Sequence, residues 1–221
     1  MSPILRLNLN EMLYLRDPQA TDLGRRLLAA SVQLLDKIGF EAFTFKKLAL
    51  NLGSTEASLY RYFENKHRLL TYLVNWHWVW LRFRVRFALH NVADPRQRLA
   101  HALGAVCDAS VDDPATPDFD EAALYRVVVA EASKAYLTKE VDTDDRAGLF
   151  QEYKLLVGEL SAVVQTINPV YPHPHALAST LLESARKQLF FSQHLPSLTD
   201  VGNVREFLEH LAIAALAPAA P

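Results

Sequence analysis

Between Phe43 and Lys66 the sequence gathers side chains that can bind a polyanion. Hydroxyl and ammonium groups stand at or beside expected helix starts, where the positive ends of helix dipoles also attract phosphate groups. An arginine in the same segment can bond both acceptor atoms of guanine, the commonest base-specific contact. The chemistry indicated is contact with double-stranded DNA. The candidate residues are Thr44, Lys46, Lys47, Thr55, Glu56, Ser58, Tyr60, Arg61, Tyr62 and Lys66.

The spacing of three residues predicts the element that presents these side chains. Ala49, Gly53 and Leu59 stand at offsets of four and six residues, as two short helices crossing through a tight turn require. Gly53 can adopt the positive φ of the turn without steric cost. The second helix should begin near Ser54 or Thr55, which are good N-caps. We expect it to expose Glu56, Ser58, Arg61 and Tyr62, with Ser58 and Arg61 as base readers.

From Leu27 to Leu73 the chain resembles the DNA-binding domain of the TetR family of bacterial transcriptional regulators. The matching strings are Ile38–Phe40 (IGF) at the end of a first helix, FTFKKLA at the start of a second, and LYRYFENK from Leu59 to Lys66. The resemblance covers about a quarter of the chain. The resemblance implies phosphate contacts for Thr44, Tyr60, Tyr62 and Lys66. The chain departs from the family pattern at Ser54, where an apolar residue is usual, and at Glu56, which bears on base preference.

Composition predicts a globular all-α protein. The chain has 221 residues, of which 50% are hydrophobic and only 7 are glycine, and its leucine, alanine and charged runs favour helices. No apolar run reaches the roughly 18 residues that span a bilayer, and the N-terminus lacks the order of a signal peptide. A single cysteine, Cys107, agrees with a reducing compartment. We therefore expect a cytoplasmic protein.

The charges divide along the chain. Residues 21–90 contain 11 Lys and Arg against 5 Asp and Glu, a net charge of +6, whereas residues 91–221 contain 10 against 18, a net charge of −8. The basic part can release counterions from a phosphate backbone, and the acidic part would be repelled by it. The alternative is that helix surfaces differ in sign by chance.

Helix signals predict three parts. Residues 1–20 should form an extended arm, and residues 21–70 a three-helix helix-turn-helix domain. A long helix from Asn65 to about Asn91 then leads into a helical effector-binding and dimerisation domain over residues 71–217. Inside the first domain we expect helices over 21–38 and 44–52. After the long helix we expect helices from Asp94 to about Ser110 and near 119–138, 144–167, 175–194 and 200–217.

Aromatic residues on the long helix are candidates for a ligand cavity. Trp76, Trp80, Phe83 and Phe87 follow one another at spacings of four, three and four residues, and so form one stripe. The resemblance implies a pocket bounded partly by this helix, and the expected ligand residues are Trp76, Trp80, Phe83, Tyr125, Val129 and Phe190. The alternative is ordinary helix-packing core.

No pattern in the sequence indicates catalysis, a cofactor or a metal. Glu64 and His67 have the spacing found in di-iron bundles, but such a site needs two pairs of this kind with two further glutamates. Cys107 has no ligand partner at metal spacing and is most simply a small buried residue.

We therefore expect a sequence-specific transcriptional repressor whose operator binding is released by a small-molecule ligand. It should act as a homodimer, because two recognition helices are needed to read a palindrome, and helix 175–194 with helix 144–167 should form the interface. The rival is a helical small-molecule-binding protein or enzyme that does not bind DNA. A third possibility is a regulator without an effector.

Overall fold

The computed structural model describes residues 7–111, 120–200 and 202–217, and these ranges contain helices and no strand. The expected all-α fold is confirmed. The chain forms two compact units: unit 1 comprises residues 1–80 and 110–152, and unit 2 comprises residues 81–109 and 153–221. The division into an arm and two functional domains stays a prediction.

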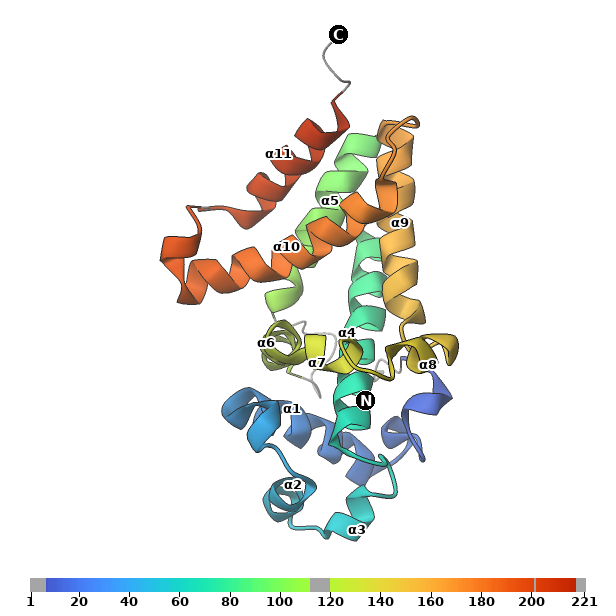
Figure 1. Cartoon of the computed structure of the whole chain (residues 1–221), viewed down its shortest axis with the longest axis vertical. Coiled ribbons are helices and arrows are strands. Elements are labelled where there is room, and N and C mark those ends of the chain that lie inside the picture. Colours follow the sequence, from blue (N-terminus) through green and yellow to red (C-terminus); the bar gives the residue numbers. More distant parts are fainter. Residues whose placement is uncertain (1–6, 112–119, 201, 218–221) are drawn as a thin grey trace. The chain divides into compact units, whose positions relative to one another are not determined.

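Unit 1 contains the N-terminal helices and a later helical segment (Figure 1). Its helices are α1 (Asp22–Ala42), α2 (Phe45–Leu52), α3 (Glu56–Leu59), the first part of α4 (Lys66–Ala88), α6 (Glu121–Glu131), α7 (Ser133–Tyr136) and α8 (Val141–Arg146). Its core includes Leu27, Phe43, Leu48, Phe63 and Trp80, all fully buried. Because burial of large apolar side chains is the main stabilising term in folding, these residues hold the helices of unit 1 together.

The turn between α2 and α3 has the geometry that the spacing predicts. Gly53 has φ 63° and ψ 36°, in the left-handed region, and ends α2. The Ser54 N–H donates to the Ala49 carbonyl at 2.9 Å, and Leu59 is fully buried. Thr55 is the N-cap of α3, since its hydroxyl accepts from the Ser58 N–H. The expected helix-turn-helix is therefore confirmed as a structural element.

A polar seam joins α1 to α6 within unit 1. Arg126 binds Asp36 through two nitrogens, with Nη2 at 2.7 Å from Oδ2, and the Gln33 amide donates to Asp120 at 2.6 Å. Near its end α1 is kinked at Gly39, which has φ 71° and ψ 165°. The α6 segment is thus fixed against the helix that precedes the helix-turn-helix.

Unit 2 contains the last turns of α4, α5 (Pro95–Cys107), the main part of α9 (Gln151–Ile167), α10 (Pro174–His194) and α11 (Val204–Leu216). Helix α10 packs against α5 and α11, and α11 also packs against α5; Figure 1 shows α10 and α11 joined through a short 3₁₀ helix at Pro196–Leu198. Arg82 of α4 donates to Glu159 of α9 at 2.8 Å. These contacts build a second core without residues of the helix-turn-helix.

Several expected helix boundaries were wrong. The helix expected over 144–167 is two helices, α8 and α9, because Gly148 adopts φ 76° between them. The helix near 119–138, whose first residue lies outside the described residues, changes from α6 to α7 at Ala132. Helix α4 ends at Ala88, before Asn91 with φ 59°, and α11 begins only after its cap Asn203. Residues 7–20 are not simply extended, since they contain the 3₁₀ helices Glu11–Leu13 and Pro18–Ala20; residues 1–6 lie outside the described residues.

Candidate nucleic-acid interface

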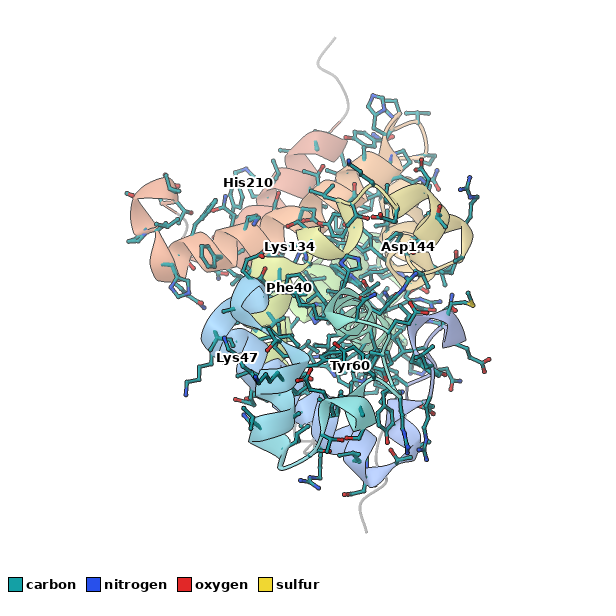
Figure 2. All side chains as sticks on the ribbon, turned by 60° about the horizontal axis from the view of Figure 1, so that its bottom comes forward. Phe40, Lys47, Tyr60, Lys134, Asp144 and His210 are labelled. Carbon is teal, nitrogen blue, oxygen red and sulfur yellow. The ribbon has the colours of Figure 1, made fainter. Side chains whose placement is uncertain are left out.

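The start of α2 presents three of the predicted phosphate contacts. Thr44 is exposed and caps the helix, accepting from the Lys47 N–H at 3.2 Å. Lys46 is exposed. Lys47, labelled in Figure 2, is also exposed, and its ammonium donates to the Ala42 carbonyl at 2.7 Å. The N-terminus of α2 therefore offers a hydroxyl and two lysines at the positive end of its dipole.

Helix α3 uses its hydroxyls locally. Ser58 exchanges a hydrogen bond with Ser54 at 2.7 Å, and its hydroxyl lies 2.6 Å from the Thr55 carbonyl. Glu56 in the first turn is half-buried. Ser54, which departs from the family pattern, thus gains a polar partner in place of an apolar contact. The base-reading role of Ser58 stays a prediction. To contact a base, its hydroxyl would have to give up one of these local hydrogen bonds.

Tyr60 and Arg61 lie in the turn after α3, because the helix ends at Leu59 and is shorter than the sequence predicts. Tyr60 is 47% exposed, and its ring meets the edge of Phe45 at 4.9 Å between centroids, which fixes the ring on the surface of the helix-turn-helix. Arg61 is exposed. These two side chains, together with Thr55 and those at the start of α2, form the exposed part of the predicted surface.

The predicted exposure of Tyr62 was wrong. Its side chain is only 2% exposed, and its hydroxyl shares a hydrogen bond of 2.7 Å with Thr21, the N-cap of α1. Tyr62 lies in the turn beyond Leu59, where its N–H donates to the Leu59 carbonyl at 2.9 Å. Its place in the structure is that of an anchor for the end of the recognition segment.

Lys66 lies at the predicted helix start but turns inward. Its ammonium donates to the carbonyls of Phe40, Glu41 and Phe43 at 2.9, 3.3 and 3.3 Å, and lies 4.5 Å from the centre of the Phe40 ring. The helix start itself is capped as expected, because the Arg68 N–H donates to the Asn65 side chain at 2.9 Å. The phosphate role of Lys66 stays a prediction.

Phe40 is also contacted by α6 and α7. Its N–H donates to the Glu131 carboxylate at 2.9 Å. The Lys134 ammonium lies over its ring, 5.6 Å from the ring centre, and Figure 2 labels both residues. The Lys134 ammonium binds both Glu131 and Glu41. The hydrogen bonds that Lys134 donates to Glu131 and to Glu41 raise the pKa of Lys134, and Lys134 lowers the pKa of Glu41. Sequence reasoning missed Glu131, because no local pattern connects residues 91 positions apart.

Two arginines near the surface were also missed. Arg26 donates to the Leu52 carbonyl at 3.2 Å, and therefore lies at the C-terminus of α2, beside the turn. Arg16 lies over the Tyr62 ring, with 5.7 Å between the guanidinium carbon and the ring centre. The sequence signal for Arg26 was available, since an exposed arginine on the first helix of a basic domain is a candidate for phosphate contact.

Part of the predicted ligand set gathers in the core of unit 1. Trp76 and Trp80 stack at 6.4 Å, and both are buried. His77, which sequence reasoning passed over, is 1% exposed and lies 6.0 Å from Trp80 and 6.1 Å from Tyr125 between ring centres. Val129 on α6 is half-buried. We call Trp76, His77, Trp80 and Tyr125 the buried aromatic cluster.

The predicted aromatic stripe on α4 was wrong as a single buried face. Phe83 and Phe87 are 51% and 76% exposed, whereas the two tryptophans are buried. Phe83 and Phe190 belong to unit 2, and Phe190 is half-buried against His194. One hollow of unit 2, about 650 Å³ in volume, is lined by other residues: Arg96, Ile167, Asn168, Val170, Tyr171, Pro172, Ile213, Ala215, Leu216 and Ala217.

The fold and this surface define a helix-turn-helix protein with a second helical unit. Residues 27–73 match the sequence model of a family described as bacterial regulatory proteins, tetR family. This match confirms the resemblance to the TetR family over the helix-turn-helix. No curated protein matches the chain.

Solved structures share the fold across almost the whole chain. The crystal structure of AibR in complex with isovaleryl coenzyme A and operator DNA is 19% identical, with a TM-score of 0.60, and covers 87% of this chain and 97% of its own. The fatty acid degradation regulator FadR from Bacillus halodurans is 15% identical, with a TM-score of 0.62 and coverages of 87% and 98%. The superantigen PfiT is 16% identical, with a TM-score of 0.61 and coverages of 90% and 97%.

Over the described residues, no helix is both long enough and apolar enough to cross a membrane.

Proposed function

We propose that the protein is a transcriptional repressor that binds operator DNA through α2 and α3. The observation that carries the proposal is the confirmed α2–Gly53–α3 helix-turn-helix, which presents Thr44, Lys46, Tyr60 and Arg61 on an exposed surface. Arg61 is assigned to base reading and the α2 side chains to phosphates, since helix N-termini and lysines position a protein without reading sequence. The net charge of +6 over residues 21–90 supports this assignment.

The proposed regulator is a homodimer formed through α10 and α11. Phe207 and Leu211 stand one turn apart on α11 and are each 37% exposed, and Leu195 and Leu198 near the end of α10 are also exposed. The exposed residues of α9 are mostly polar, among them Lys154, Gln165 and Thr166. An apolar exposed face fits a self-complementary twofold interface better than a polar one. We therefore propose that α11, instead of the helix over 144–167, forms the interface together with α10.

The proposed effector is a small molecule with an apolar body. The buried aromatic cluster supports this, because stacked indoles and a buried histidine offer apolar faces together with a few polar atoms, as ligand sites do. AibR, which shares the fold, was crystallised with isovaleryl coenzyme A, and FadR is a fatty acid degradation regulator. An acyl thioester is therefore the first effector class to test by its effect on operator binding.

The rival function is a helical protein that does not bind DNA. The likeness to PfiT favours this rival, since a protein described as a superantigen has the same fold. A fold alone does not determine function. The two functions differ in how binding depends on salt. Neutralising several phosphates makes affinity fall steeply as salt rises.

The test selects bound fragments from the genome of the source organism and then measures affinity for the selected duplex by fluorescence anisotropy at several salt concentrations. We expect one palindromic site and a steep salt slope. A duplex of scrambled sequence serves as the control for specificity. Retention that is weak, independent of sequence and insensitive to salt would reject the repressor and favour the rival.

A further inference from the structure

Residues 7–20, which we call the N-terminal strap, run along unit 1 between two turns far apart in the sequence. At one end the Asn10 amide donates to the Ala147 carbonyl at 2.8 Å. At the other end the Leu15 N–H donates to the Tyr62 carbonyl at 2.8 Å. Between these contacts Leu13 is 1% exposed and so anchors the strap in the core. The strap therefore connects the turn after α8 with the turn after α3.

The strap and the start of α1 hold Tyr62 through three different parts of the residue. Leu15 binds its carbonyl, the Arg16 guanidinium lies over its ring, and Thr21 shares a hydrogen bond with its hydroxyl. Tyr62 is only three residues beyond Leu59, the last residue of α3. A residue fixed at its main chain, its ring and its hydroxyl leaves the end of α3 little freedom to move.

Hydrogen bonds within the strap restrict its conformation. Leu7 and Gln19 are joined by two hydrogen bonds, from the Leu7 N–H to the Gln19 side chain at 3.2 Å and from the Gln19 amide to the Leu7 carbonyl at 2.8 Å. Asn10 also caps the first 3₁₀ helix, accepting from the Met12 N–H at 2.9 Å. These hydrogen bonds close the strap into a loop and restrict its conformation.

The anchor of the strap is a turn that is itself fixed to α4. Ala147 precedes Gly148, which has φ 76°, and Asp144 in the same region accepts from Arg68 of α4 at 3.0 Å. A Cβ on Gly148 would lie 3.3 Å from the Asn10 amide nitrogen, so the turn and Asn10 are in close contact. Directly beyond this turn the chain enters α9, whose residues from Tyr153 onward belong to unit 2.

We propose that the strap positions the recognition helix, with Asn10 as the positioning residue that links the α8–α9 turn to Tyr62 and α3. This inference rests on the proposed function only for its effect on operator affinity. A shift of the α8–α9 turn then reaches α3 through the strap, by a route separate from α4.

The deciding variant is Asn10→Asp. It keeps a side-chain oxygen that accepts from Met12, but it replaces the amide that donates to Ala147 with a carboxylate oxygen, which repels that carbonyl. The loss of one hydrogen bond is therefore the smallest effect expected of this variant. Met12→Ala, in the same 3₁₀ helix and 67% exposed, is the matched control. Asn10→Gln keeps an amide donor and should lie between Asn10→Asp and the wild type.

The first measurement is hydrogen exchange of the free protein, which needs no DNA. Loss of one hydrogen bond corresponds to a change of about fivefold in an opening equilibrium. We therefore expect amides 58–63 to exchange about fivefold faster in Asn10→Asp, with unchanged exchange over α6 and a melting temperature close to that of Met12→Ala. Unchanged exchange over 58–63, or faster exchange throughout unit 1 with a lower melting temperature, would overturn the proposal.

The second measurement is affinity for the selected operator duplex. We expect Asn10→Asp to bind about fivefold more weakly than the wild type, with Asn10→Gln between them. Wild-type affinity in Asn10→Asp, despite faster exchange, would overturn the positioning role. If the wild type binds no DNA, the proposed function fails, and the exchange data alone still decide whether the strap holds α3.

Discussion

At the start of α4, the Lys66 ammonium neutralises the carbonyl end of α1. The last carbonyls of a helix carry the negative end of its dipole and lack partners inside the helix, and Lys66 binds three carbonyls in this region. Since hydrogen bonds to a charged group contribute about 1.5–3 kcal/mol, Lys66→Ala should lower the free energy of unfolding by about that amount. Urea unfolding measures it, with the exposed Lys46→Ala as control. Equal stability of the two variants would show that these hydrogen bonds do not stabilise the fold.

Arg61 is the residue for which base reading can be tested most directly. It is exposed in the turn after α3. Arg61→Ala should cost about 1–3 kcal/mol at one base-pair position per half-site, because the bidentate contact with guanine is lost. Binding to a library randomised over the half-site measures this. The control Lys46→Ala should weaken all sequences alike. An unchanged base preference at every position would remove Arg61 from the readout.

At the scale of elements, the kink of α1 depends on Gly39. Its φ of 71° and ψ of 165° lie in a region that only glycine adopts easily, whereas Gly53 lies in the ordinary left-handed region. Gly39→Ala should therefore cost about 1–3 kcal/mol of unfolding free energy, and Gly53→Ala about 1–2 kcal/mol. Chemical unfolding of both variants gives the comparison. Wild-type stability of Gly39→Ala would show that the α1–α2 connection can form without the kink.

Helix α4 provides a test of core against pocket. Trp80 is fully buried and Phe87 is 76% exposed. Trp80→Ala should lower the free energy of unfolding by about 3–5 kcal/mol, whereas Phe87→Ala should change it by less than about 0.5 kcal/mol. Thermal and urea unfolding measure both. If Trp80→Ala keeps most of its stability but loses the response of operator binding to an acyl thioester, Trp80 lines the effector site.

The sequence predicts elements well where their signals are local. Asn65 and Asp94 cap the helices that they were expected to start, and Gly53 forms the predicted turn. The sequence does not predict which polar side chains form contacts inside the fold instead of facing solvent. Tyr62 and Lys66 are residue types that often contact DNA at a surface. In the structure Tyr62 instead bonds Thr21 at the start of α1, and Lys66 bonds carbonyls at the end of α1. Both contacts join residues far apart in the sequence. The Glu131 contact with Phe40 is likewise invisible before the fold is known.

At the scale of the whole molecule, assembly can be tested through the exposed face of α11. Phe207→Glu combined with Leu211→Glu places two charges where the proposed twofold interface excludes water, so we expect a monomer. Analytical ultracentrifugation measures the mass, and operator affinity should fall because a monomer reads only one half-site. The control Gln165→Glu, on the polar face of α9, should remain dimeric. A dimer in the α11 double variant would place the interface elsewhere.

The polar seam between α1 and α6 also bears on how such proteins can be recombined. A chimera made by exchanging residues 1–70 would separate Asp36 from its own Arg126, Phe40 from Glu131, and Arg68 from Asp144. The helix-turn-helix segment is therefore not a unit that ends at the start of α4. A chimera that preserves the folding of this segment would also have to include residues 110–152. The unit that can be exchanged is therefore encoded by two separate stretches of the gene.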